Sequence, residues 1–250
     1  ALSAVNNYGA PCIAIKGRDF VVSVMMKNIP DSLVEADSIN GIFKVSDYIL
    51  CAISGLEGDV QEQAYRARIA SLRLRGQLGY SAPLPLLART LADQAQVRTQ
   101  VMERRPLGVV CLLMSASPEL GPELYRVEPN GQFLKCWATA CGREQEEALQ
   151  LLEDRADHLV KDARRRERKA PDDNADDAGQ ASAAAANPFD RLSVEDAVGV
   201  ALNVLKKVIA RKECLSQDNT EIALVSMKDS KISLHQCSRV ESQSFLEKYC

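Results

Sequence analysis

Apolar residues near the start of the chain come in short runs that are typical of β-strands. Residues 12–15 and 20–26 are apolar and flank a polar turn, and residues 43–45 and 48–54 repeat this pattern. Strand, turn and strand in this order predict antiparallel pairing. We therefore expect two strand pairs here, preceded by a short helix in residues 1–8.

The spacing of apolar and small residues then changes to that of a helix. One predicted helix has a face made of Val60, Ala64, Ala67, Ser71, Leu74 and Leu78. These residues recur at steps of three and four, which is the period of one helical face. A second helix is predicted over residues 85–103. Pro106 ends it, because the residue before a proline disfavours the helical conformation.

The second half of the chain repeats this order of strands followed by helices. Strands are predicted at 107–114, 124–128, 133–139, 222–227 and 231–234, and helices at 144–168, from Ser193 onward and at the C-terminal end. Asn130-Gly131 joins the second and third of these strands, and Asn-Gly is a strong hairpin signal. The order of elements predicts an α+β fold, a four-layer αββα sandwich in which helices flank two antiparallel sheets.

One segment, at residues 168–188, interrupts this pattern. A basic stretch at 161–169 runs into acidic residues at 172–177 and then into a tract of alanine, serine and glutamine. Such a composition buries too little apolar surface to fold. We therefore expect a single domain over residues 1–250, with a disordered surface insertion at 168–188. A nuclear-localisation or nucleic-acid role for the basic stretch is an alternative. We favour the interpretation that the basic stretch is the solvated end of a helix, where its cations complement the helix dipole.

Composition narrows the classes of ligand and partner. The 250 residues are 46% hydrophobic and 26% charged, with a net charge of −3. This balance is typical of a globular protein and favours neither nucleic acid nor membrane as a partner. No apolar run approaches the roughly 18 residues of a membrane-spanning helix, and the first residues do not resemble a signal peptide. The eight cysteines form no Cys-x-x-Cys pair, and His158 and His235 lie in no cysteine or carboxylate pattern of family type. We therefore expect structural histidines, no metal, no cofactor and a reducing compartment.

Short motifs along the chain indicate a family. They are Ser54-Gly55-Leu56, Arg66-Ala67-Arg68, Arg105-Pro106-Leu107-Gly108, Gly121-Pro122-Glu123-Leu124-Tyr125, Glu128-Pro129-Asn130-Gly131 and Ala138-Thr139-Ala140-Cys141-Gly142. Each is weak alone, but in this order and spacing the chain resembles the alpha subunits of the 20S proteasome, apart from the insertion and the C-terminal end. Pro30-Asp31-Ser32-Leu33, Gly79-Tyr80 and Leu107 look most like the alpha type-6 class.

The resemblance implies the fold of the N-terminal-nucleophile hydrolases without their chemistry. Catalytic relatives use an N-terminal threonine whose own amine is the base, supported by an aspartate and a lysine. Aligning the first strands places these positions at Gly9, near Met25 and near Asn40, and none of these residues can do that work. The chain is therefore expected not to be an enzyme. The alternative is a self-standing amidohydrolase, with Cys12 as nucleophile after cleavage of the residues before it.

Alpha subunits of this family build a seven-membered ring, and the resemblance implies the same role here. The implied partners are neighbouring alpha subunits, beta-ring subunits, and regulatory-particle ATPases or other activators. The implied function is structural: ring assembly, a contribution to the axial substrate gate, and docking of regulators in ubiquitin- and ATP-dependent protein degradation, in cytoplasm and nucleus. The gate-forming tail of the family precedes the residue that corresponds to Ala1, so we expect the tail and part of the first helix to lie ahead of it.

The activator-docking pocket of the family has a partial counterpart. Gly55 and Leu56 match its glycine and its hydrophobic residue, but its carboxylate-binding lysine falls at Gly41. Docking there is a form of terminal-carboxylate capture, which the loss of the lysine weakens. We therefore predict that the pocket to which this chain contributes Gly41 binds activator tails weakly or not at all.

Overall fold

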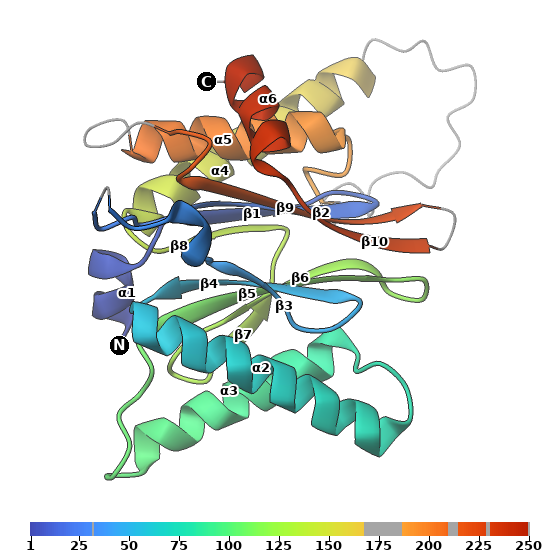
Figure 1. Ribbon diagram of the computed structural model, residues 1–250. Helices are drawn as coiled ribbons and strands as arrows, with labels where there is room; N and C mark the ends of the chain where they lie inside the picture. Colours follow the sequence, from blue (N-terminus) through green and yellow to red (C-terminus); the bar gives the residue numbers. More distant parts are fainter. Residues whose placement is uncertain (32, 168–186, 210–214, 229–230, 250) are drawn as a thin grey trace.

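A computed structural model describes residues 1–31, 33–167, 187–209, 215–228 and 231–249 of the chain. These residues form two antiparallel sheets packed face to face between layers of helices (Figure 1). The elements are α1 (Leu2–Tyr8), β1 (Cys12–Lys16), β2 (Phe20–Met26), the 3-10 turn η1 (Ala36–Ser38), β3 (Ile42–Lys44), β4 (Ile49–Gly55), α2 (Glu57–Leu78), α3 (Leu84–Gln100), β5 (Val109–Ser117), β6 (Gly121–Val127), β7 (Phe133–Lys135), β8 (Ala138–Cys141), α4 (Gln145–Glu167), α5 (Val194–Ile209), β9 (Thr220–Lys228), β10 (Lys231–Gln236) and α6 (Arg239–Tyr249).

The two sheets have five described strands each. Sheet I has the order β10-β9-β2-β1-β8, and sheet II the order β3-β4-β5-β6-β7. All neighbouring strands are antiparallel, with β1 paired to β2 from Cys12↔Met25 to Lys16↔Val21. The α+β sandwich predicted from the order of elements is therefore confirmed.

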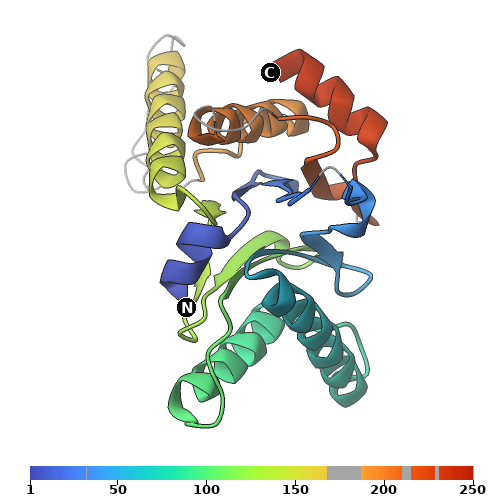
Figure 2. The ribbon, with the colours of Figure 1, turned by 60° about the vertical axis from the view of Figure 1, so that its left-hand side comes forward.

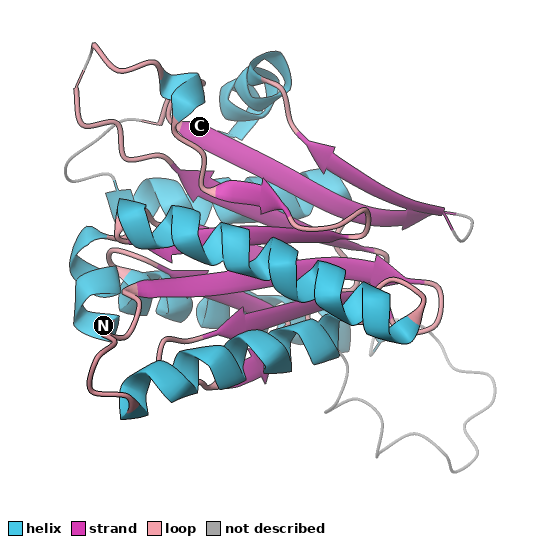
Figure 3. Ribbon diagram, turned by 60° about the horizontal axis from the view of Figure 1, so that its bottom comes forward, coloured by secondary structure: helices cyan, strands magenta, loops and turns pink. Residues whose placement is uncertain are grey.

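Helices cover the outer face of each sheet, as Figure 2 shows from the side. α4, α5 and α6 lie on sheet I, and α2 and α3 lie side by side across sheet II (Figure 3). The face of α2 toward the sheet is made of small residues, including Ala64, Ala67 and Ala70, all at most 2% exposed. Because these side chains are short, the helix axis can approach the strands closely.

A third apolar cluster fills the space between the sheets. It includes Ala14, Val21, Ala52, Leu112 and Val225, none of which is exposed. β2 and β4 are buried along their whole length, because one face of each strand meets helices and the other meets the opposite sheet. This double burial explains why their sequences are continuous apolar runs instead of alternating ones.

The predicted strand at 133–139 is wrong in one respect, because two strands in different sheets replace it. β7 pairs with β6 in sheet II, which confirms the predicted hairpin, whereas β8 pairs with β1 in sheet I. The chain crosses between the sheets at Cys136 and Trp137, where the Trp137 carbonyl accepts a hydrogen bond from the Lys16 amide at 2.7 Å. Residues 133–139 include no glycine or proline, so the segment contains no signal for a change of sheet.

The ends of two other predicted segments also differ. α3 ends at Gln100 instead of 103, because Val101 is already extended. Residues 168–186 of the predicted insertion lie outside the described residues, but Asn187 is 9% exposed and its amide donates to the Lys16 carbonyl at 2.8 Å. The predicted disorder is therefore wrong at Asn187. Within the described residues, no helix combines the length and the apolar character that crossing a bilayer requires.

Candidate functional site

The end of α1 meets the ends of β4 and β8 at a corner of the sandwich. Gly9 is buried there, and its amide donates to the Val5 carbonyl at 2.8 Å. A Cβ atom at Gly9 would lie 2.6 Å from Ser54 Oγ, which itself donates to the Ala10 carbonyl at 2.6 Å. Gly9 therefore has an amide nitrogen that is used inside a helix cap, and no room for a nucleophilic side chain.

Met25 and Gly41 face each other beside this corner. Met25 is 3% exposed, and a Cβ atom at Gly41 would lie 2.3 Å from its sulfur. The thioether thus occupies the space where a longer side chain at position 41 would begin. Asn40 is exposed, and its amide, oriented so that both ends find partners, donates to Glu221 Oε1 at 3.1 Å.

A small pocket joins these positions. It is lined by Ala10, Met25, Lys27, Asn28, Ile39, Asn40, Gly41, Ile53, Gly55, Glu57 and Val60. Among these described lining residues there is no serine, threonine or cysteine, so the pocket lacks a hydroxyl or thiol nucleophile. We call it the corner pocket. Gly55 and Gly41 both line it, whereas Leu56, 36% exposed, lies beside it at the start of α2.

The positive charge of Lys27 in the corner pocket is already compensated. Lys27 lies 3.1 Å from Glu221 Oε1, with side chains 9% and 6% exposed, and it also donates to the Ala36 carbonyl at 3.0 Å. Glu221 Oε2 accepts hydrogen bonds from the amides of Gly41 and Ile42, both at 3.0 Å. The lysine and both backbone donors are therefore engaged by one buried carboxylate, which leaves them less available to a second carboxylate.

Cys12, the nucleophile of the alternative hypothesis, is unsuited to that role. It is 1% exposed in the middle of sheet I, paired with Met25 on one side and Cys141 on the other. A hydrogen bond with Cys141 and burial both raise the pKa of its thiol well above the ordinary value. A protonated, enclosed thiol is a weak nucleophile.

The motifs Ser54-Gly55-Leu56 and Arg105-Pro106-Leu107-Gly108 meet at the same corner. Gly55 has a φ of +154°, and a Cβ there would lie 2.0 Å from the Gly108 carbonyl oxygen, so only glycine fits. The same carbonyl accepts a hydrogen bond from the Leu56 amide at 3.0 Å. The two motifs therefore hold the turn into α2 against the start of β5.

Asp59 fastens this turn. Its carboxylate accepts two hydrogen bonds from Arg105, both at 2.6 Å, and one from the Gly108 amide at 2.8 Å. The Arg105 guanidinium lowers the pKa of Asp59 and burial opposes it, while the pKa of Arg105 is raised by the same contact. The result is an acidic side chain that stays ionised and fixes the position of Gly55 and Leu56.

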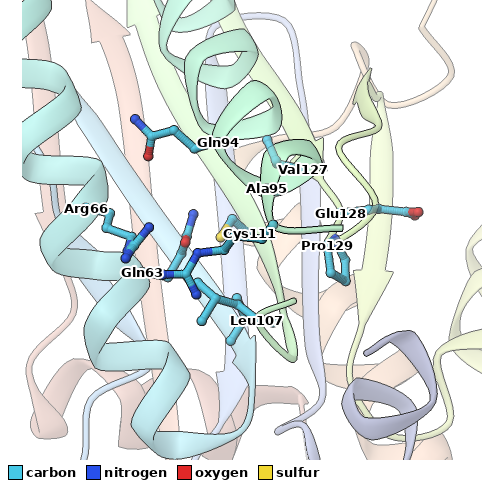
Figure 4. Close-up of a pocket in the computed structure, with 11 residues that line it drawn as sticks. Gln63, Arg66, Gln94, Ala95, Leu107, Cys111, Val127, Glu128 and Pro129 are labelled. Carbon is cyan, nitrogen blue, oxygen red and sulfur yellow. The ribbon is translucent and has the colours of Figure 1, made fainter. Parts of the chain in front are cut away.

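A second pocket lies between α2 and α3 over sheet II (Figure 4). Two guanidiniums line it: Arg66 is paired with Glu62 at 2.6 Å, and burial together with the charge of Arg66 lowers the pKa of Arg98. The sequence-predicted residues Gly41, Gly55 and Leu56 are not among its lining residues. The sequence did not predict this pocket, because its residues come from two helices, two strands and the loops beside them, which no single motif joins.

One more cluster was missed. The sequence assigns a structural role to His235 and does not predict that Cys237 and Glu241 converge on it. The signal was present in the chain as His-x-Cys followed directly by Ser-x-x-Glu, a helix-start pattern that turns the glutamate back toward the strand. His158, by contrast, is exposed on α4.

Comparisons with known proteins agree with the motifs. Residues 6–167 match the model of the family described as "Proteasome subunit". The chain is similar to "Probable proteasome subunit alpha type-1" of Schizosaccharomyces pombe, 33% identical over 155 residues, or 62% of this chain and 64% of the relative. "Proteasome subunit alpha type-6" of Caenorhabditis elegans is 35% identical over 153 residues, or 61% and 62%.

A third similarity extends over most of the chain. "Proteasome subunit alpha" of Pyrococcus abyssi is 27% identical over 238 residues, which are 95% of this chain and 76% of the relative. The matches to the first two relatives, in contrast, span less than two thirds of the length of each.

Proposed function

The chain belongs to the proteasome subunit family, and from this premise we propose that it is a non-catalytic alpha-type subunit of the 20S core particle. The names of its relatives support the alpha type, since all three are called alpha subunits and one of them alpha type-6. Its function is to build the alpha ring.

The observation that carries the non-catalytic assignment is the corner pocket. Gly9 has neither a side chain nor a free amine, Met25 fills the place of an acid with a thioether, and Asn40, in the place of the lysine, has no charge. An N-terminal nucleophile whose own amine is the base needs a hydroxyl or thiol side chain, a free amine, an acid and a charged lysine at these positions. The alternative, a self-standing amidohydrolase, lacks support because Cys12 is enclosed in sheet I.

Ring assembly with neighbouring alpha subunits and a beta ring is supported by the two-sided character of α1. Val5 is fully buried in the cluster between the sheets, whereas Leu2 is 36% and Tyr8 67% exposed. One face of this short helix is thus anchored while the other presents apolar and aromatic surface. Head-to-tail contacts between different surfaces close into a ring when the rotation permits it.

Gating and regulator docking form the finer part of the proposal. The gate tail would precede Ala1, and regulatory ATPases or other activators would dock between neighbouring alpha subunits. The compensated charge at Lys27 and Glu221 supports weak capture of an activator's terminal carboxylate by this subunit. The setting we propose is ubiquitin- and ATP-dependent protein degradation in cytoplasm and nucleus, which imaging of a tagged chain would test.

Affinity purification of the tagged chain tests the assignment. The expected result is co-purification of other alpha subunits and of beta subunits, in a particle whose proteolysis is unchanged when Cys12 is replaced by serine. Recovery of the chain alone, with hydrolytic activity that the Cys12→Ser variant loses, would instead support the amidohydrolase.

A further inference from the structure

Three side chains with different metal-binding atoms converge where β10 leads into α6. They are His235, Cys237 and Glu241, and one ligand atom from each lies within 4.8 Å of the other two. We propose that these residues form a binding site for a divalent transition metal of the zinc class. Neither the ring-building role nor the family match assigns this site, and the proposal does not depend on them.

The backbone explains why the three residues meet. His235 and Cys237 are two residues apart in an extended segment, so their side chains point to the same side. His235 pairs with Leu224 of β9, and the Cys237 amide donates to the Ile222 carbonyl at 2.9 Å. Two of the ligands are therefore held by the edge of sheet I, which is a rigid support.

The third ligand is brought back by the start of α6. Ser238 precedes the helix, its amide donates to Glu241 Oε2 at 2.8 Å, and the Glu241 amide donates to Ser238 Oγ at 3.4 Å. This reciprocal arrangement is a capping box. It directs the Glu241 carboxylate toward the strand, where Oε2 also lies 3.0 Å from His235 Nε2.

The set of donor atoms suits zinc. An imidazole nitrogen, a thiolate and a carboxylate oxygen are its usual ligands, at about 2.0–2.3 Å, so neighbouring ligand atoms lie about 3–4 Å apart. The three ligand atoms already lie within 4.8 Å of one another, so they need to move only slightly closer. The side chains of His235 and Glu241 are 48% and 46% exposed and can rotate. Three protein ligands leave a fourth position for water or for a residue of a neighbouring subunit.

The carboxylate of Glu241 brings a negative charge to the cluster, and a bound cation would balance it. The Cys237 thiol is partly exposed, and it binds a metal as the thiolate. On binding, the metal takes the place of the thiol proton, which is released to solvent, and the sulfur–metal bond forms. The nearby cation Arg239 does not balance the charge of Glu241, because it pairs with Asp37 at 2.7 Å and Asp218 at 3.5 Å.

Titration of the full chain with Co²⁺ under reducing conditions tests the proposal. We expect one equivalent to produce a thiolate-to-cobalt charge-transfer band in the near ultraviolet and the visible bands of tetrahedral cobalt, and Zn²⁺ to abolish both by displacement. Binding should tighten as the pH rises, because the Cys237 thiol must lose its proton.

Variants separate ligation from folding. Cys237→Ser should abolish the charge-transfer band. Glu241→Gln should weaken Co²⁺ binding by more than about tenfold, although glutamine can keep the capping box and α6 with it. Cys136→Ser removes another partly exposed thiol and should leave the spectrum unchanged, as should replacement of Cys214 and Cys250, which lie outside the described residues.

Two outcomes overturn the proposal. One is a wild-type chain that gives no charge-transfer band with Co²⁺. The other is a band that persists in Cys237→Ser, or that disappears equally in Cys136→Ser, because the metal would then be bound by other thiols.

Discussion

Met25 lies against Gly41 at the point where a lysine of the family's docking pocket would begin. The missing charge could be read from the sequence, because Gly41 has no side chain. The contacts around Gly41 could not be predicted from the sequence, because Glu221 is far along the chain and reaches the Gly41 amide only through the pairing of β9 with β2. The sequence thus identifies Gly41, whereas only the fold shows that Glu221 lies beside it.

Restoring the lysine should restore capture of a carboxylate. Because a Cβ at position 41 would touch the flexible end of Met25, the variant to make is Gly41→Lys combined with Met25→Ala. We expect the assembled ring to bind a peptide with a free C-terminal carboxylate about tenfold more tightly, since a charge-assisted hydrogen bond contributes about 1.5–3 kcal/mol. Fluorescence anisotropy measures the affinity.

The matched control is Gly41→Ala with Met25→Ala, which makes the same space without adding charge. The C-terminally amidated peptide should show no gain with either variant. Equal binding of the free-carboxylate peptide by the wild type and the lysine variant would contradict our account of the pocket.

Asp59 should make stability depend on pH. Its pKa is lowered in the folded chain by Arg105, below the unfolded value of about 3.9. The stabilisation is therefore complete above the unfolded pKa and is lost as the pH falls through the folded one. Denaturation between neutral and acidic pH should show a steeper loss of the free energy of unfolding for the wild type than for Asp59→Asn.

At neutral pH, Asp59→Asn should cost about 1–3 kcal/mol, because a buried hydrogen-bonded carboxylate is replaced by an amide that satisfies Arg105 less well. Asp93→Asn is the control, since Asp93 is 73% exposed and 4.0 Å from Arg89. If both substitutions changed the pH dependence alike, the Asp59 contact would not be its cause.

Among the elements, α5 shows where sequence patterns are most reliable. Its buried face, which includes Ala201, Leu202 and Leu205, repeats with a clean helical period, and Ser193, where the predicted helix begins, caps it, with the Asp196 amide donating to Ser193 Oγ at 3.1 Å. β7 and β8 show the opposite case. No turn residue separates them in the sequence, and only the pairing of β8 with β1, which is distant in sequence, assigns them to different sheets.

Packing of α5 on sheet I should account for much of the stability. Leu205→Ala removes a fully buried side chain and should lower the free energy of unfolding by about 2–5 kcal/mol. Leu72→Ala on α2 removes the same atoms from a position that is 65% exposed. This substitution should change the free energy of unfolding by less than about 0.5 kcal/mol. Urea denaturation of the two variants makes the comparison, and similar losses would contradict the assigned burial.

For the whole molecule, the order of strand groups and helix pairs was sufficient to predict two covered sheets. The arrangement of strands within each sheet was not predictable in this way, because β9 and β10 join sheet I beside β2, far from them in sequence. The His235 cluster depends on the same long-range pairing. The function that we propose rests on the corner where α1 meets the two sheets, where Gly9 and Met25 stand at the expected catalytic positions and Tyr8 is exposed.

Native mass spectrometry of the particle isolated with this chain distinguishes a non-catalytic ring subunit from a self-standing hydrolase. One spectrum gives the mass of the assembly and, after ejection of a subunit, the mass of this chain within it. We predict a large assembly with several different subunits of similar size, in which this chain keeps the residues ahead of Cys12. A monomer, or a chain that has been cut to begin at Cys12, would contradict a non-catalytic ring subunit.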